Sequence, residues 1–244
     1  MISLILPHFI FDPRVIMPLI LNIESGTEIC SAALSKNGAI LSLKENKEGN
    51  KHSSIMTLLI EDLYNETGIA MSATDAVAIS KGPGSYTGLR VGTSVAKGIC
   101  FALDLPLIAI DSLQAIAYGM KVESDEEGIY LPMIDARRME VYTNLYDQDL
   151  NPLRAPEAKI IEANSFDHIL EHGERLILGG NGAEKCKNVL VNPYLSFTSV
   201  RSSAANMTLL AEKSFFANKM EQISPFSPFY LKGANVTRSK KKLF

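Results

Sequence analysis

The stretch from Lys81 to Gly98, KGPGSYTGLRVGTSVAKG, constrains the fold more than any other part of the chain. It follows a short apolar run at residues 75–80 that has the length of a buried strand. The sequence Gly82-Pro83-Gly84 ends that strand, because two glycines and a proline do not continue a ladder of hydrogen bonds. Ser85 or Thr87 can then cap a helix that continues to about residue 103. The segment therefore predicts a strand, a tight turn and a helix in succession.

One face of this predicted helix has almost no side-chain bulk. Gly88, Gly92, Ala96 and Cys100 are spaced four apart and therefore lie on one side. Glycine in a helix interior costs about 1 kcal/mol relative to alanine, so we expect something to pack very close to this face. It could be the chain's own sheet or a partner helix. We favour the partner, because a second apolar face at Leu89, Val95, Ile99 and Leu103 already suffices for the core.

The remaining pattern predicts an α/β protein. Strands are expected at residues 19–24, 29–35 and 39–44, the last two joined by the hairpin signal Asn37-Gly38. A helix at 53–67, the strand at 75–80, the helix after the glycine turn, a strand at 106–110 and a helix at 111–118 follow. Later strands are expected at 130–135, 140–146 and 175–178, and a late helix at 203–220. The first eight elements have the order of the ribonuclease-H-like unit of actin-like ATPases and sugar kinases.

Composition narrows the class of protein. The hydrophobic share of 46% and the charged share of 21% are ordinary for a globular domain, and 244 residues can bury an ample core. The net charge of −3 predicts no strong attraction to nucleic acid or to an anionic membrane. The three cysteines, Cys30, Cys100 and Cys186, are far apart and indicate reduced thiols in a cytoplasmic protein rather than a metal site. No apolar run approaches the ~18–20 residues that span a bilayer.

Several motifs together resemble the TsaB family, whose members are needed to make N6-threonylcarbamoyladenosine in tRNA. The most specific motif is GPGSYTGLRVG at 82–92 followed by AKG at 96–98. ILNIES at 20–25, His52-Ser53, IDARRMEVY at 134–142 and PFYLK at 228–232 agree with further family motifs in order and spacing. The resemblance runs from about Met17 to Lys232. It implies a two-lobed actin-like (ASKHA) fold with ribonuclease-H-like halves, of which the second is reduced.

The resemblance also implies an organisation of the chain. We expect residues 1–16 to be a non-native extension that precedes the true start at Met17. Residues 17–118 would form the first lobe and 119–232 the second, with the helix at 203–220 packing back on the first. Residues 233–244, which include Lys240, Lys241 and Lys242, are expected to be a basic, disordered tail.

The family resemblance implies an accessory subunit rather than an enzyme. The partner would be the catalytic relative TsaD, bound so as to activate transfer of threonylcarbamoyl to adenosine 37 of ANN-decoding tRNAs. The ATPase TsaE would join the complex, a homodimer would use the same face, and tRNA would be bound through the complex. Two helices from each partner would form the interface, and the residues expected in it are Gly88, Leu89, Gly92, Val95, Ala96, Ile99, Cys100, Met56, Leu59 and Leu63.

Two other activities remain open. The first is an actin-like ATPase or phosphotransferase, for which Gly82, Gly84, Ser85, Thr87, Glu24 and Thr27 would bind phosphate. No Walker lysine follows the turn, so we expect no nucleotide cofactor on this chain alone, and ATP or ADP only in the complex. The second is a metallopeptidase. The HxxxH metal motif of TsaD aligns with Ser112 and Ile116, and neither side chain replaces imidazole as a ligand.

Three weaker signals each have a structural explanation as well as a functional one. His168 and His172 are four apart, a spacing that could hold a metal, but a surface pair near a helix end is the favoured interpretation. The segment Asp135–Glu140 places two acids and two arginines in one turn. Either its arginines contact a partner, or they form internal salt bridges that fix the turn. The lysine run at 240–242 could contact RNA, although a solubilising tail is favoured.

Overall fold

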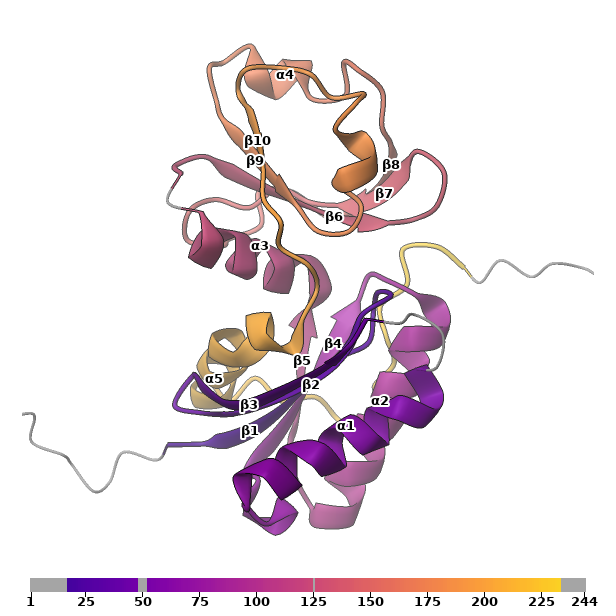
Figure 1. Ribbon diagram of the computed structural model, residues 1–244, viewed down its shortest axis with the longest axis vertical. Helices are drawn as coiled ribbons and strands as arrows, with labels where there is room; N and C mark the ends of the chain where they lie inside the picture. The colour runs from indigo at the N-terminus through magenta and orange to yellow at the C-terminus, as the bar shows by residue number, and fades with distance from the viewer. Residues whose placement is uncertain (1–16, 48–51, 125, 234–244) are drawn as a thin grey trace, which may run out of the picture.

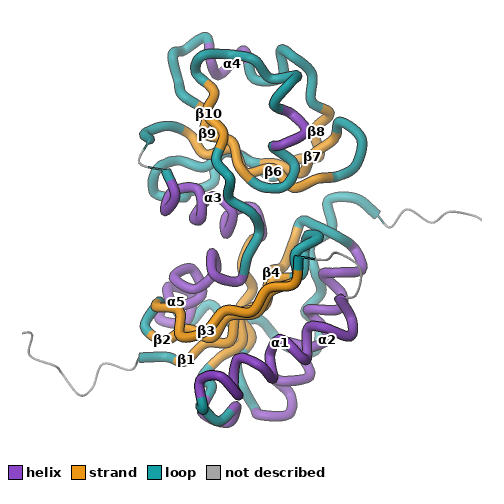
Figure 2. The backbone as a smooth tube through the Cα atoms, viewed as in Figure 1, coloured by secondary structure: helices purple, strands orange, loops and turns teal. Residues whose placement is uncertain are grey.

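The computed structural model describes residues 17–47, 52–124 and 126–233, with the backbone alone for 52–54. The expectations for residues 1–16 and for the lysines of the tail lie outside these residues. The chain forms two five-stranded sheets, one above the other in Figures 1 and 2. The mixed α/β class is therefore as predicted. Within the described ranges, no helix is both long and apolar enough to cross a membrane.

The first sheet contains the elements that the glycine-rich segment predicts. Its strands are β1 (Leu19–Glu24), β2 (Cys30–Lys36), β3 (Ala39–Asn46), β4 (Ala76–Gly82) and β5 (Leu107–Asp111), in the order β3-β2-β1-β4-β5. The hairpin strands β1, β2 and β3 are antiparallel, whereas β4 and β5 run parallel to β1. Asn37 and Gly38 turn β2 into β3 with positive φ angles of 53° and 70°. Asparagine and glycine tolerate this left-handed conformation, which is why the pair predicted the hairpin.

Helices cover both faces of this sheet. α1 (His52–Thr67) and α2 (Tyr86–Leu103) lie on one face, and α3 (Ser112–Glu123) and α5 (Thr208–Phe216) on the other. Alternate residues of β1 divide between the two layers: Leu21 and Ile23 belong to the core cluster under α1 and α2, and Ile20 to the one under α3 and α5. This period of two is the geometry of a strand buried on both faces.

The second sheet is smaller and has little helical cover. Its strands are β6 (Ile129–Asp135), β7 (Glu140–Thr143), β8 (Glu157–Ile160), β9 (Leu176–Gly179) and β10 (Leu195–Phe197), in the order β10-β9-β6-β7-β8. The four-residue α4 (Asp167–Leu170) and the short 3₁₀ turn η2 (Glu184–Cys186) are the helical elements described between β8 and β10.

α3 joins the two sheets into one core. It contacts β6 and β9 of the second sheet as well as β4 and β5 of the first. The same apolar cluster includes Ile110 and Ile116 from the first part of the chain and Tyr130, Tyr146 and Ile177 from the second. All five side chains are at most 3% exposed. The two halves therefore share a buried layer instead of meeting across solvent.

The structure corrects two of the predicted elements and adds a third. The strand expected at 140–146 ends at Thr143, and Tyr146 makes only isolated bridges. The helix expected at 203–220 is a 3₁₀ turn, η3 (Ala204–Met207), followed by α5, which ends at Phe216. A short 3₁₀ turn, η1 (Met71–Ala73), also precedes β4. α5 packs on β1, β3 and β5 of the first sheet, although it follows the second sheet in sequence.

Residues 217–233 form an extended segment, here called the C-terminal strap. It first pairs with the edge of the first sheet, where Glu221 N donates to Leu107 O at 2.8 Å. Lys97 of α2 then holds it through bonds from Nζ to the carbonyls of Ser224 and Phe226, at 2.9 and 3.2 Å. The end of the strap, yellow in Figure 1, reaches the level of the second sheet.

Candidate binding surfaces

Three glycines of the GPGSYTGLRVG motif at residues 82–92 pack on the turn between β1 and β2. A Cβ added at Gly84 would lie closer than 3.0 Å to Gly26 O, and one at Gly88 closer than 3.0 Å to Ser25 O. A Cβ at Gly92 would meet the Ser25 hydroxyl in the same way. Side-chain carbons do not approach backbone atoms this closely. These three glycines, here called the glycine seam, therefore allow α2 to lie directly against the hairpin turn.

The backbone of the glycine turn is also bonded within the chain. Ser85 N donates to Gly26 O at 2.6 Å, and Gly82 N donates to the Ser112 hydroxyl at 3.1 Å. Ser85 caps α2, as predicted, by accepting from Gly88 N at 3.3 Å. Three of the N–H groups that would line a phosphate site thus have partners. The geometry favours a structural role for the turn over a phosphate cradle.

The predicted partner interface needs correction at the residue level. Gly88 and Gly92 are buried, and Ala96 and Cys100 are 0% exposed, because the small face of α2 lies against the chain's own sheet. The remaining six predicted residues belong to the interior or its edge. Leu89, Met56 and Leu63 are 0% exposed, Leu59 is 9% exposed, and Val95 and Ile99 are half-buried. The small residues solve a packing problem inside the monomer, so this set as a whole is not available to a partner.

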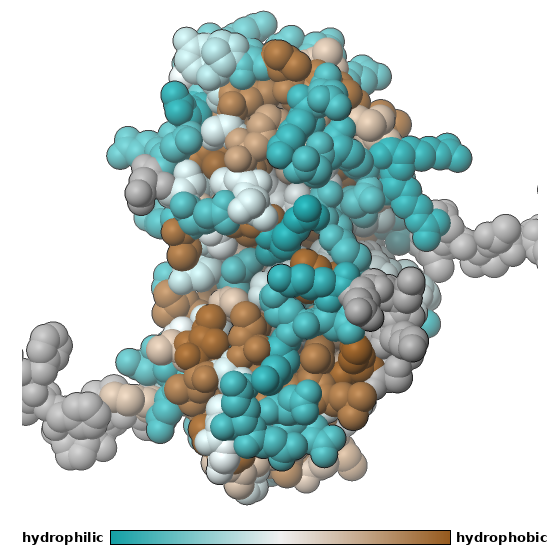
Figure 3. Space-filling view, in the orientation of Figure 1, coloured by the Kyte–Doolittle hydropathy of each residue, from teal (hydrophilic) through white to brown (hydrophobic). Residues whose placement is uncertain are grey.

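The outward faces of α1 and α2 nevertheless expose large apolar side chains. Leu58 of α1 is 55% exposed and Phe101 of α2 is 85% exposed. The two helices lie side by side in both ribbon views and contact each other. Apolar patches interrupt the polar surface of the lower lobe in Figure 3, one of them on the side of α1 and another near α5. Sequence periodicity missed Leu58 and Phe101 because both lie outside the stripes used to define the faces.

Glu24 lies at the end of β1 with no exposed surface. Its Oε1 accepts from Gly26 N at 2.5 Å and from the Ser80 hydroxyl at 3.0 Å. Burial raises the pKa of Glu24 above its ordinary value, and these hydrogen bonds only partly offset that effect. Thr27, the other residue predicted there, forms hydrogen bonds within the turn, to Ile29. Both residues thus have contacts that order the hairpin.

Asp111 sits between the two sheets. Its Oδ1 caps α3 by accepting from Leu113 N and Gln114 N, at 3.0 and 3.1 Å. The same oxygen accepts from the Tyr146 hydroxyl at 3.2 Å, which links the end of the first sheet to the second part of the chain. Burial raises the pKa of Asp111 as well. This carboxyl therefore has a capping role and a linking role.

The residues aligned with metal ligands are internal. Ser112 and Ile116 are 0% exposed in α3. His168 and His172 are on the surface at and after α4, as the favoured interpretation requires. Among the described residues, no group of three or more His, Cys, Asp or Glu side chains is placed to hold a metal ion.

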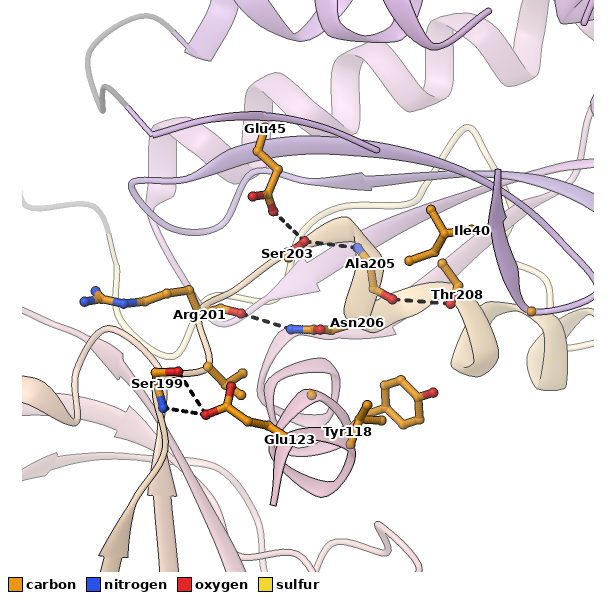
Figure 4. A pocket seen from close by; sticks show the side chains of 14 residues that line it. Ile40, Glu45, Tyr118, Glu123, Ser199, Arg201, Ser203, Ala205, Asn206 and Thr208 are labelled. Carbon is orange, nitrogen blue, oxygen red and sulfur yellow. Dashed lines mark hydrogen bonds between the residues drawn. The ribbon is translucent and has the colours of Figure 1, made fainter. Parts of the chain in front are cut away.

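Two open cavities are lined by none of the predicted site residues. The larger, of about 570 Å³, is bounded by the β2–β3 hairpin, α3 and residues 199–208 (Figure 4). Its two carboxylates are engaged by the connecting segment: Glu45 accepts from Ser203 Oγ at 2.7 Å, and Glu123 from Ser199 N and Oγ at 2.8 and 2.9 Å. The smaller, of about 520 Å³, lies between Lys81 and the C-terminal strap.

The turn between β6 and β7 bears on the two interpretations of Asp135–Glu140. Its acids are held by lysines from elsewhere, since Lys185 bonds to Asp135 and Lys232 to Glu140 at 2.5 Å. Arg137 and Arg138 are exposed, and among the described residues neither guanidinium has a hydrogen-bond or ion-pair partner. Ion pairs therefore fix the turn through its two acids, whereas the described part of the chain provides no such partner for either arginine.

Comparisons with known proteins agree with this fold. The family model described as "TsaD: tRNA N6-adenosine threonylcarbamoyltransferase" matches residues 46–232. "tRNA threonylcarbamoyladenosine biosynthesis protein TsaB" of Haemophilus influenzae is 35% identical over 123 residues, which are 50% of this chain and 51% of the relative. The protein of the same name from Bacillus subtilis is 24% identical over 217 residues, which are 87% of this chain and 93% of the relative.

The solved structure described as "YeaZ from Pseudomonas aeruginosa" has a TM-score of 0.73 and 25% identity, and it covers 88% of this chain and 100% of that one. The match to the Haemophilus relative spans about half of that protein's length. The predicted actin-like, ASKHA-type fold class is confirmed by these matches together with the two-sheet architecture.

Proposed function

Because the chain belongs to the family of the tRNA N6-adenosine threonylcarbamoyltransferase TsaD, as a member of the TsaB (YeaZ) type, we propose that it serves tRNA threonylcarbamoyladenosine biosynthesis as a non-catalytic subunit. Its role is to bind TsaD and hold it in the active arrangement for modifying adenosine 37 of ANN-decoding tRNAs. TsaE joins the assembly as a third subunit. Any ATP or ADP is bound at the level of the complex.

The outward surface of α1 and α2 is the observation that carries this proposal. Leu58 and Phe101 are too exposed for a role in the chain's own core. Ile55, Val95 and Ile99 of the same helices are half-buried and pack against the core, and only the exposed part of each side chain adds to this surface. Two such helices from each of two subunits can pack as a four-helix bundle. A stable interface of this kind buries about 1,200–2,000 Å². The same surface serves a homodimer when TsaD is absent.

The interior of α3 supports the non-catalytic part of the proposal. Ser112 Oγ is used as an acceptor for Gly82 N, and Ile116 lies in the core that the two sheets share. A position filled by isoleucine provides no metal ligand. The chemistry is therefore assigned to TsaD.

Light scattering on size exclusion tests the proposal directly. The chain alone is expected to be a homodimer that converts to a one-to-one heterodimer when the TsaD of the same organism is added. Leu58→Glu and Phe101→Glu should each abolish both forms of pairing while leaving the far-UV circular dichroism spectrum unchanged. Each places a charge on the exposed apolar surface proposed for pairing and leaves the buried core unchanged.

Phe216→Glu is the matched control, since Phe216 is 56% exposed on α5, on the other face of the same sheet. Retained pairing in this variant, with loss in the other two, supports the α1–α2 surface. A chain that stays monomeric and ignores TsaD overturns the proposed function. Equal loss in all three variants overturns the assignment of the surface.

A further inference from the structure

A row of cations crosses from the first lobe to the second beside the C-terminal strap. It consists of Arg90, Lys232, Lys185, Arg137 and Arg138, here called the basic strip. Arg90 of α2 donates from Nε to the Tyr230 hydroxyl at 3.3 Å, and Lys232 two residues later bonds to Glu140 of β7. Lys185 donates to the carbonyl of Glu140 at 2.6 Å and pairs with Asp135, beside the two free arginines.

The basic strip has an excess of positive charge. Its five cations have only two carboxylates among their partners in the described residues, Asp135 and Glu140. Arg90, Lys232, Arg137 and Arg138 are all exposed. In addition, the strap ends beside the strip, and the eleven residues that follow Gly233 include four cations and no acid. The other 233 residues therefore hold 20 cations and 27 acids, so the net charge of −3 conceals a strongly uneven distribution.

The turn that presents the free arginines has an unusual backbone. Arg137 and Arg138 have φ angles of 74° and 51°, both in the left-handed region. This conformation costs a residue with a side chain about 1–2 kcal/mol, and turns of this kind normally use glycine or asparagine. No ion pair or hydrogen bond of the two guanidinium groups offsets this cost, because neither group has a partner among the described residues. The cost is consistent with a function outside the chain.

Aromatic side chains lie within the same strip. The rings of Tyr86 and Tyr230 are 4.9 Å apart between centroids, and the Arg90 guanidinium lies 4.3 Å from the centroid of the Tyr86 ring. Both tyrosines are partly exposed. Exposed arginines interleaved with aromatic rings are typical of surfaces that bind RNA, because guanidinium forks match phosphates and rings stack on bases.

We propose that the basic strip binds the phosphate backbone of tRNA directly, with Arg137 and Arg138 as its principal phosphate contacts. The inference rests on the proposed function for the choice of RNA as the polyanion. It departs from the expectation, based on net charge, that this chain contributes no RNA contact of its own. Arg90 is the member of the strip that belongs to α2, whereas Arg137 and Arg138, the principal phosphate contacts, lie in the turn between β6 and β7 of the second sheet.

The test is fluorescence anisotropy of the full chain with an unmodified transcript of an ANN-decoding tRNA, over a series of salt concentrations. Two phosphate contacts contribute about 1.8 to the slope of log affinity against log salt. Arg137→Ala/Arg138→Ala is expected to lower the slope by about that amount and to weaken binding about tenfold. The matched control is Arg175→Ala/Lys187→Ala, which removes two cations that already pair with Glu126 and Glu184, and it should bind like the parent.

Several outcomes overturn the inference. One is an unchanged tRNA affinity in Arg137→Ala/Arg138→Ala. Another is an equal loss of tRNA affinity in the control Arg175→Ala/Lys187→Ala. The third such outcome concerns a chain truncated after Gly233. If replacing both arginines in that chain does not lower its affinity for tRNA, the residues after Gly233 account for binding and the inference fails. Loss of TsaD pairing by the double variant with unchanged tRNA affinity identifies the strip as a protein-docking surface and rejects RNA.

The same samples on size exclusion with TsaD separate this inference from the proposed function. If replacing the arginines lowers tRNA affinity but the parent chain does not pair with TsaD, the proposal that the strip binds tRNA is supported and the proposed function is overturned. If pairing is normal and replacing the arginines does not change tRNA affinity, only the proposal that the strip binds tRNA is overturned.

Discussion

At the scale of single residues, the meaning of the glycine seam depends on what lies opposite it. The spacing of Gly88 and Gly92 correctly predicted a close approach, but it could not say to what. Nothing in the sequence indicates that the atoms packed against these glycines belong to Ser25 and Gly26, some sixty residues earlier. Sequence reasoning assigned the small face to a partner because the helix had a second apolar face. In the folded chain the hairpin turn occupies the space instead.

Gly88→Ala is expected to destabilise the protein by about 2–3 kcal/mol, because the new methyl group meets a backbone carbonyl that cannot move aside. Gly98→Ala on the same helix is the matched control, since a Cβ there meets nothing within 4 Å. It should stabilise the protein by about 0.5–1 kcal/mol through helix propensity. Urea unfolding followed by circular dichroism measures both changes, and similar effects from the two substitutions would contradict the seam.

Glu24 makes stability depend on pH in a defined direction. Its pKa is raised in the folded state, so between pH 4.5 and that raised value the folded chain holds a proton that the unfolded chain has released. Stability from this group is present at low pH and is lost as the pH rises. Glu24→Gln keeps an acceptor for Gly26 N but does not titrate. We expect its stability relative to the parent to increase from pH 4 to pH 8 in urea unfolding.

The pH effect of Glu24 can be separated from that of the other raised carboxyl. Asp111 contributes in the same direction, but it is present in both proteins and cancels in the difference. A difference between parent and variant that stays constant over this pH range would show that Glu24 is not the titrating group.

At the scale of elements, patterns that depend on neighbours in sequence predicted well. β1 has the predicted bounds, and α1 and α2 lie where periodicity, Ser85 and the glycine turn placed them. Elements that depend on distant contacts were missed. β10 pairs with β9 and has three residues, and β8 is an edge strand of four. Both alternate polar and apolar residues, but over too few positions for the pattern to identify a strand. The exposed apolar residues Leu58 of α1 and Phe101 of α2 were missed for the related reason that exposure is set by the final packing.

The C-terminal strap is also an element that sequence alone could not place. Phe229 N donates to Lys81 O at 2.7 Å, next to Gly82, where a Cβ would clash with the carbonyl of Phe229. Gly82→Ala is therefore expected to release this part of the strap, in addition to straining a backbone with φ of 106°. Hydrogen exchange should increase at residues 221–232 and not at β9. Unchanged exchange in the strap would show that it is held elsewhere.

At the scale of the whole molecule, α3 makes the two sheets one cooperative structure. Ile116 is 0% exposed in the cluster that both sheets share. Ile116→Ala is expected to lower the free energy of unfolding by about 2–5 kcal/mol, and hydrogen exchange should accelerate in β4 and β9 together. Loss of protection confined to the first sheet would show that the two halves unfold separately.

The path of the chain has a consequence for biosynthesis. The first sheet is built from residues 19–111, yet α5 and the strap that complete it are the last described segments to leave the ribosome. Domains ordinarily fold from the N-terminus as translation proceeds. In this protein the first sheet is synthesised early, but one of its faces stays incompletely covered until nearly the whole chain has been synthesised. A nascent chain stalled before residue 204 should therefore be a client of ribosome-associated chaperones, whereas the finished chain should not.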